Sequence, residues 1–168
     1  MNDDTDIAAA REGEHPVAHR HRVLAEGAEA WARLQALLEE HADRENLHDP
    51  SGTPWSSREI YAHFARYQSS NIRHMHCLLA SGELWTSNGE GGDDENVINE
   101  RWAAEDRALT LEEARAWCEA TTEQARAVAM SLPPEVWAQW GRWVADDVLA
   151  PHYLSHIRYI ETGGREGG

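Results

Sequence analysis

The sequence contains no lysine, because all 15 of its basic residues are arginine. A chain without lysine has no side-chain amine that can form a Schiff base with a carbonyl substrate or contact the phosphates of a nucleotide in a P-loop. Acidic residues outnumber basic ones, which gives a formal net charge of −15 and a pI of about 5.0. Phosphate backbones and anionic lipid surfaces both attract clustered positive charge, so we expect neither nucleic acid nor a membrane as a partner.

Long apolar runs and cysteines are also scarce. No stretch approaches the roughly 20 apolar residues of a membrane-spanning helix, and the acidic start MNDDTDIAAAREGE lacks the basic region and apolar run of a signal peptide. We therefore expect a cytoplasmic protein. Cys77 and Cys118 are the only cysteines, too few for a disulfide framework, and we expect both to be small buried apolar side chains.

No segment shows the alternating apolar pattern of a β-strand, whereas apolar residues recur at spacings of three, four and seven, as in helices with one buried face. This pattern predicts an all-α protein, a four-helix bundle with a short extra helix in the connection between its second and third helices. The predicted long helices are 16–42, 56–81, 110–132 and 147–162; the short helix is 96–108, and a turn of helix through EVWAQW precedes the last one. The predicted domain organisation is a flexible arm (1–15), one helical-bundle domain (16–163) and a flexible tail (164–168).

Two helix starts carry strong local signals. In WSSREI, Ser56 is a candidate cap and Glu59, three residues later, can accept a hydrogen bond from the backbone N–H of the cap residue. Trp55 and Ile60 occupy the two positions of a hydrophobic staple around the same start. Thr110 and Glu113 form a second candidate capping box. These signals fix where two of the four long helices begin.

The segment HYLSH places His152 and His156 one turn apart on one face of the last predicted helix. Its apolar neighbours predict that this face points into the bundle, where His63 of the second predicted helix can join the pair. Three histidine ligands leave coordination positions open for water or substrate, as in catalytic zinc sites. The alternative is three separate core histidines held by hydrogen bonds, and spacing does not decide between the two readings.

The remaining histidines and the nearby tyrosines are weaker candidates for the site. His74 lies on the same stripe as His63 but about 16 Å further along the helix axis, too far to ligate the same ion. Tyr67 and Tyr159 are expected in the core. The histidines near the N-terminus and near the end of the first helix are expected at the surface: His15, His19, His21, His41 and His48.

The segments WSSREIYAHFARYQ, NVINERWAAEDRALTLEEARAW and HYLSHIRYI, in this order and at these separations, resemble the DinB-like superfamily of four-helix bundles, and especially its ClbS/DfsB branch. The resemblance covers roughly residues 17–162. It implies that His63, His152 and His156 bind a divalent metal, most often zinc or nickel. It also implies kinship with transferases and isomerases that use a low-molecular-weight thiol such as mycothiol, and with a hydrolase that opens the reactive ring of a DNA-alkylating natural product.

Two classes of function follow from these features. The first is a metal-dependent thiol S-transferase or hydrolase that acts on an electrophilic small molecule, with the thiol supplied by a cofactor because neither cysteine lies in a nucleophile motif. The second is a non-catalytic, stress-related binding or sequestration bundle with a structural metal or with none. Trp137, Trp140 and Trp143 cluster before the last helix, where they could cap the pocket or form the face of a homodimer; we favour the homodimer, because aromatic residues are enriched at interfaces.

Overall fold

The structure, a computed structural model, describes residues 8–47, 54–83, 95–148 and 150–162. These residues form six helices and no strand, so the all-α prediction is confirmed. The helices are α1 (Pro16–Glu40), α2 (Ser57–Ser81), α3 (Glu95–Asp106), α4 (Leu111–Ser131), α5 (Pro134–Val148) and α6 (Ala150–Thr162). None of them is long and apolar enough to cross a bilayer.

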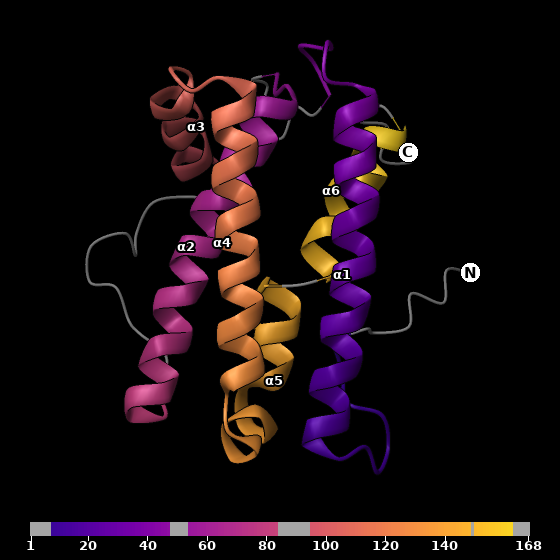
Figure 1. The fold of residues 1–168 in the computed structure, drawn as a ribbon, viewed down its shortest axis with the longest axis vertical. Helices are drawn as coiled ribbons and strands as arrows, with labels where there is room; N and C mark the ends of the chain where they lie inside the picture. The colour runs from indigo at the N-terminus through magenta and orange to yellow at the C-terminus, as the bar shows by residue number, and fades with distance from the viewer. Residues whose placement is uncertain (1–7, 48–53, 84–94, 149, 163–168) are drawn as a thin grey trace.

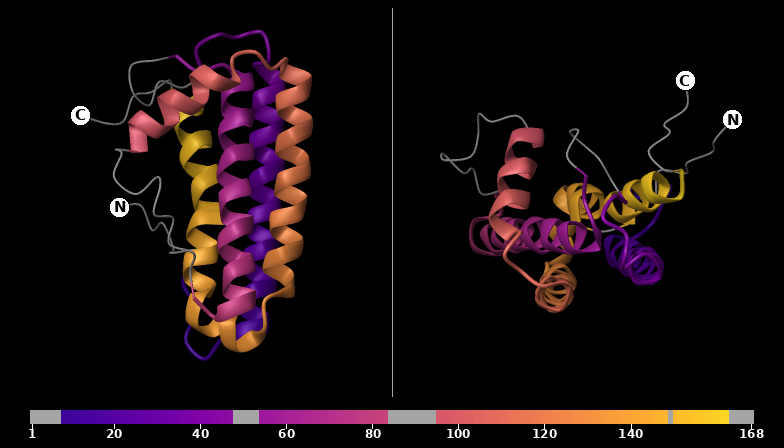
Figure 2. Two further views of the ribbon diagram at one scale, coloured as in Figure 1. Left: turned by 90° about the vertical axis from the view of Figure 1, so that its left-hand side faces the viewer. Right: turned by 90° about the horizontal axis from the view of Figure 1, so that it is seen from above.

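The long axis of the molecule is shared by four columns of helix (Figure 1). Three columns are α1, α2 and α4; the fourth is α5 followed by α6, which together run the height of the bundle (Figure 2). The closest packing is between α2 and α4, while α1 packs on α6 and α5. The short α3 lies outside the bundle beside α2, in the connection between α2 and α4 (Figure 2). The predicted four-column architecture with one extra helix is confirmed.

Both predicted capping boxes form. The Ser56 hydroxyl accepts a hydrogen bond from the backbone N–H of Arg58 at 3.2 Å, and the Glu59 carboxylate accepts one from the N–H of Ser56 at 2.9 Å. At the start of α4, the Thr110 hydroxyl accepts a hydrogen bond from the N–H of Glu113 at 3.2 Å, and the Glu113 carboxylate accepts one from the N–H of Thr110 at 2.8 Å. Each box satisfies N–H groups that an uncapped helix start leaves without an intrahelical acceptor.

The core has two clusters, one in each half of the bundle. Trp31 of α1 lies at the centre of the first, where its indole meets the rings of Tyr61, Phe64 and Tyr153 at centroid distances of 6.3, 6.2 and 5.3 Å. The second cluster joins α1, α2, α4 and α5; its buried residues include Val23, Ile72, Met75, Ala125, Trp137 and Val144. Cys118 is fully buried in the first cluster as predicted, whereas Cys77 is only half-buried.

The prediction for residues 133–162 is wrong in one respect, because EVWAQW is not an isolated turn. A full helix, α5, starts at Pro134, and the last helix begins at Ala150 rather than at residue 147. The Pro133 carbonyl accepts the first backbone hydrogen bond of α5, from the N–H of Trp137 at 2.9 Å. A proline at the first position of a helix loses no hydrogen bond, so the Pro-Pro pair ends α4 and starts α5 at once.

The tryptophans of α5 also differ from expectation. Trp137 is 1% exposed, and Trp140 and Trp143 are half-buried against the second core cluster. The indole N–H of Trp140 donates to the Gly82 carbonyl at the end of α2 at 3.0 Å. These side chains attach α5 to α1 and α2 and do not form an exposed patch. The homodimer therefore stays a prediction that the tryptophans no longer support.

The predicted arm is ordered in the part that the structure describes. Ala8 is fully buried, and its carbonyl lies 3.0 Å from Nε2 of His19. Arg22 donates to the Ala9 carbonyl at 2.8 Å and to the Glu14 carboxylate at 2.9 and 3.0 Å. Residues 8–15 thus pack on α1, and His19, which was expected at the surface, is 4% exposed. Residues 1–7 of the predicted arm and the predicted tail 164–168 lie outside the described residues.

Candidate metal centre

Three histidines from two helices meet in the first core cluster. His63 lies in the second turn of α2, and His152 and His156 lie one turn apart on α6. The Nε2 atoms of His63 and His152 are 3.2 Å apart, and one ring nitrogen of each of the three histidines lies within 4.8 Å of those of the other two. The structure thus brings together the three residues that the sequence singled out.

Local signals in the sequence explain these positions. The capping box at Ser56 fixes the start of α2, and His63 follows one turn after Glu59 on the buried face. Pro151 lies in the first turn of α6, where a proline is tolerated, so a helix can begin directly before His152. The spacing of four then aligns the His152 and His156 side chains along one face.

The donor set suits a divalent transition metal. Two imidazole nitrogens bound to one tetrahedral ion at about 2.0–2.1 Å lie about 3.3 Å from each other, close to the 3.2 Å between His63 and His152. No cysteine, aspartate or glutamate of the described residues joins the group. Three neutral imidazoles would leave the full charge on the ion and at least one coordination position open. Zinc, nickel, copper and iron all accept such ligands.

Aromatic rings enclose the three histidines on the bundle side. The Trp55 ring lies 5.1 Å from that of His63, and the Phe64 ring lies 4.7 Å from His152 and 4.8 Å from His156, measured between centroids. Trp55 and Phe64 are at most 1% exposed. This wall keeps bulk water away from the inner side of the site, which strengthens any electrostatic interaction there.

The solvent side of the site is at His152 and Tyr67. His63 and His156 are 6% and 7% exposed, whereas His152 and Tyr67 are both half-buried. The rings of Tyr67 and His152 are 4.4 Å apart in an edge-on arrangement. The sequence predicts Tyr67 and Tyr159 in the core. Tyr67 instead lies half-buried at the edge of the histidine cluster, and Tyr159 is half-buried as well.

Burial also sets the charge of the site. His152 is half-buried, but the rings packed around its imidazole desolvate it and lower its pKa to about 4. An imidazole with such a pKa is neutral at pH 7, and only the neutral form has a lone pair for a metal. A metal therefore does not have to displace a proton from His152 at neutral pH.

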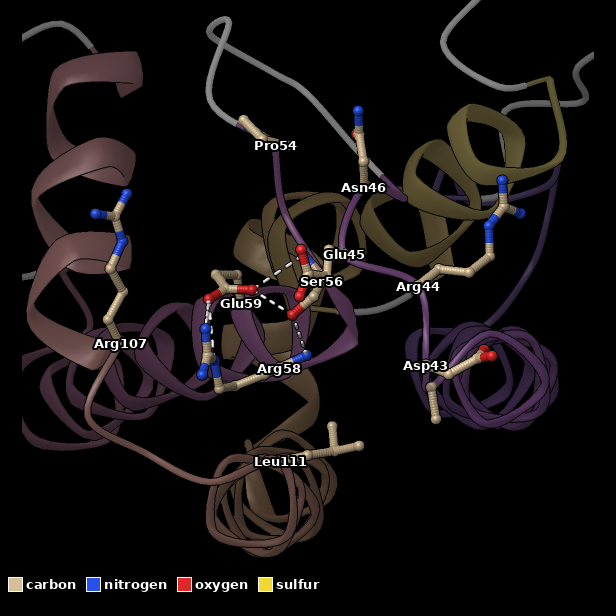
Figure 3. A pocket seen from close by; sticks show the side chains of 11 residues that line it. Asp43, Arg44, Glu45, Asn46, Pro54, Ser56, Arg58, Glu59, Arg107 and Leu111 are labelled. Atoms are coloured by element: carbon tan, nitrogen blue, oxygen red, sulfur yellow. Dashed lines mark hydrogen bonds and ion pairs between the residues drawn. The ribbon is translucent and has the colours of Figure 1, made fainter.

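A cleft of about 680 Å³ lies at the same end of the bundle (Figure 3). It is bounded by the connector after α1, the first turn of α2, and Arg107 and Leu111 near the start of α4. The three histidines do not line it, but Pro54 and Ser56, the neighbours of Trp55, do. No sequence pattern predicts this cleft, because its walls come from three separate parts of the chain.

One buried histidine was missed from sequence. His19 accepts a hydrogen bond at Nδ1 from the Trp137 indole at 3.1 Å, which leaves Nε2 protonated to donate to the Ala8 carbonyl at 3.0 Å. These bonds join α1 to α5 and to the segment before α1. The spacing of His19 from Val23 and from Ala30 is consistent with the buried face of α1. Its polar neighbours in the sequence nevertheless indicated an exposed position.

Comparison with known proteins places this architecture in a family. A family model described as the DinB superfamily matches residues 26–157, which is most of the chain. No curated protein and no solved structure matches the chain significantly. The matched range contains all three histidines of the candidate metal centre. The chain belongs to the DinB superfamily.

Proposed function

We propose that this member of the DinB superfamily binds one divalent transition metal ion, zinc or nickel, through His63, His152 and His156, and that it uses the ion on an electrophilic small molecule. The single observation that carries this proposal is the convergence of three imidazole nitrogens from α2 and α6, with a pair separation that fits a tetrahedral ion. The reaction we favour is thiol S-transfer or hydrolysis. The order Trp55, capped helix, Ala62–His63 and HYLSH supports placement in the ClbS/DfsB branch.

When bound, a divalent ion with an open position lowers the pKa of a coordinated thiol or water and polarises a carbonyl. The chain supplies the setting for this chemistry. Trp55 and Phe64 exclude water from the inner side, and the lowered pKa of His152 keeps its imidazole neutral. Tyr67, at the edge of the His152 ring, stands where a ligand enters and can orient it.

A thiol nucleophile has to come from outside the chain. Cys118 is fully buried, and burial raises the pKa of its thiol well above the usual range, so it is not a thiolate at neutral pH. Cys77 is half-buried on α2 and does not belong to the histidine group. A low-molecular-weight thiol such as mycothiol, or water, is the remaining source, which supports a small-molecule partner.

A structural metal is the second candidate. Along its backbone α6 packs chiefly on α1 and α5, and the histidine cluster joins it to α2. An ion held here would cross-link two helices of the bundle, which would stabilise the fold without any reaction. In that case the protein would be a non-catalytic binding or sequestration bundle.

Metal analysis of the untagged protein tests the proposal. We expect about one equivalent of zinc or nickel per chain in the parent protein and almost none in the His63→Ala and His152→Ala variants. The matched control is His76→Ala, which removes an exposed histidine from the same helix as His63 and should leave the metal content unchanged. A parent protein that takes up neither metal, even from excess, would refute the proposal.

The two candidate roles separate when metal is removed. Binding at 100 times the dissociation constant stabilises a folded protein by about 2.7 kcal/mol. An open catalytic site should lose all turnover of a thiol and an electrophile on chelation, with no more loss of stability than this. A structural site should lose more stability, and no chelator-sensitive reaction should be found.

A further inference from the structure

We propose that the cleft next to the metal centre is a binding site for a small zwitterionic molecule of the amino-acid or peptide type, which it recognises through Arg44, Arg107 and Glu45. This inference is separate from the proposed function, because the cleft lies on the Trp55 side of the metal centre and none of the three histidines lines it. The shape and charges of the cleft carry it. Its test can be made with or without metal.

The cleft has the size of a ligand site and a rigid floor. Its volume of about 680 Å³ falls within the roughly 300–1,000 Å³ of small-molecule pockets. The floor is the start of α2, where Glu59 accepts hydrogen bonds from Ser56 and, at 3.0 Å, from Nε of Arg58 (Figure 3). Arg58 and Glu59 neutralise each other's charge in this ion pair, so the floor of the cleft is polar but carries little net charge.

Two arginines that form no ion pair or side-chain hydrogen bond among the described residues line the walls of the cleft. Arg107 comes from the segment between α3 and α4, and Arg44 from the connector after α1; they stand on opposite sides of the cleft (Figure 3). Among the described residues, neither guanidinium has a hydrogen-bond or ion-pair partner. In a chain with a net charge of −15, two arginines without a partner in the described part of the chain, at the edges of one cleft, can bind carboxylates, which accept two parallel N–H bonds from a guanidinium.

The acidic residues of the cleft decide between a simple anion and a zwitterion. Asp43 and Glu45 line the same space, and their carboxylates likewise have no partner among the described residues. A polyanion such as phosphate would be repelled by them. A ligand with both a carboxylate and an ammonium group pairs with both sets of charges, so the amino-acid or peptide class fits best.

The cleft is linked to the metal centre through Trp55. The residues on either side of it, Pro54 and Ser56, line the cleft, while its buried ring contacts that of His63. The Trp55 carbonyl also accepts a hydrogen bond from the N–H of Leu47 at 2.8 Å, which fixes the connector that carries Arg44 and Glu45. A ligand seated in the cleft would therefore lie on the opposite side of Trp55 from His63.

Calorimetric titration with S-methylglutathione tests the proposal, because this zwitterionic peptide has no free thiol to bind a metal. With the metal-free full chain we expect saturable binding, weakened about tenfold by Arg107→Ala and by Arg44→Ala, the effect of losing one charge-assisted contact of about 1.4 kcal/mol. Arg142→Ala, an exposed arginine on α5, is the matched control and should bind as the parent does. Glu45→Gln should weaken binding of this peptide but not of its N-acetylated form.

Several results would overturn the proposal: no binding to the parent protein, equal binding by all four variants, or inorganic phosphate binding as tightly as the peptide. The metal proposal can fail separately. His63→Ala should lose the metal and still bind the peptide, whereas Arg107→Ala should lose peptide affinity and keep the metal. Because Arg44 and Arg107 are exposed and make no contact that the fold needs, their substitution should leave the thermal midpoint unchanged.

Discussion

Gly141 of α5 gives the sharpest test of how tightly the second core cluster is packed. A methyl group added to Gly141 would lie 2.6 Å from Nε1 and 2.8 Å from Cδ1 of the Trp137 indole, much closer than atoms can approach. The indole cannot move away cheaply, because it is 1% exposed and bonded to His19. The Gly141→Ala substitution should therefore displace Trp137 and break that hydrogen bond.

The size of the effect follows from three terms. Overpacking a core costs about 1–3 kcal/mol, and loss of a hydrogen bond about 0.5–1.5 kcal/mol. Alanine is better than glycine in a helix by about 1 kcal/mol, which opposes both. We expect Gly141→Ala to lower the free energy of unfolding by about 0.5–3.5 kcal/mol, and the thermal midpoint by about 2–4 °C for each kcal/mol.

Urea unfolding of a double-mutant cycle measures the clash directly. The partner substitution is Trp137→Phe, which removes the indole N–H and part of the ring. In that background Gly141→Ala should be neutral or stabilising, so the two changes should couple by about 1–3 kcal/mol. If Gly141→Ala alone raised the unfolding midpoint, the packing of α5 described above would be wrong.

Three further predictions concern single contacts. The pKa of Glu14 is lowered to about 2 by its hydrogen bonds from Arg22 and from the backbone. The ionised carboxylate therefore stabilises the fold fully above pH 4.5, and this stabilisation is lost as pH falls toward 2. The difference in unfolding free energy between the parent and Glu14→Gln should shrink over this range in acid titrations. Asp106 accepts two hydrogen bonds of 2.7 Å from Arg66, which attaches α3 to α2; Asp106→Asn should raise hydrogen exchange in α3 at least tenfold and leave α4 unchanged. Ser56→Ala removes the α2 cap and should cost about 1 kcal/mol in chemical denaturation, with no change expected in the helix content of the folded state.

The helix starts were predictable because their signals are local. A capping box needs only two residues three positions apart, and both boxes form as the sequence indicated at Ser56 and Thr110. The end of α2 was equally local, since Gly82 adopts a left-handed conformation with φ of 76° directly after Ser81. Signals of this kind depend on a few neighbouring residues and survive in any tertiary context.

The errors came where the environment overrides the local pattern. The segment 8–15 is polar and reads as a flexible arm, yet Arg22 and His19 give its carbonyls and carboxylate partners on α1. For α5, the Pro-Pro pair indicated an interruption, but a proline at the first helical position also allows a new helix to start at once. The indoles of α5 were expected at a subunit interface because sequence does not reveal which large apolar residues the remaining helices cover.

The metal centre was predictable in its residues but not in its geometry. The spacing of His152 and His156 placed them on one face, the position of His63 on the second predicted helix made it the third candidate, and the resemblance to the superfamily implied the same three residues. That all three nitrogens approach within 4.8 Å depends on how α2 and α6 face each other, which only the packed structure gives. The cleft was beyond sequence analysis, since Arg44 and Arg107 are 63 positions apart and neither belongs to a motif.

The metal centre and the cleft at this end of the bundle have opposite physical requirements. The first turns of α2 contribute residues to both. Ligand histidines need to be neutral and shielded, so aromatic rings surround His63 and lower the pKa of His152. Recognition of a charged ligand needs accessible charges that no intramolecular partner neutralises, and Arg44 and Arg107 provide these at the rim. Glu59 lies four residues before His63, about 6 Å along the helix axis, so the same capped start supports both sites. Because the buried Trp55 ring lies between the cleft and His63, a ligand in the cleft does not reach the metal centre on that side, and a reactant enters at His152 and Tyr67 instead.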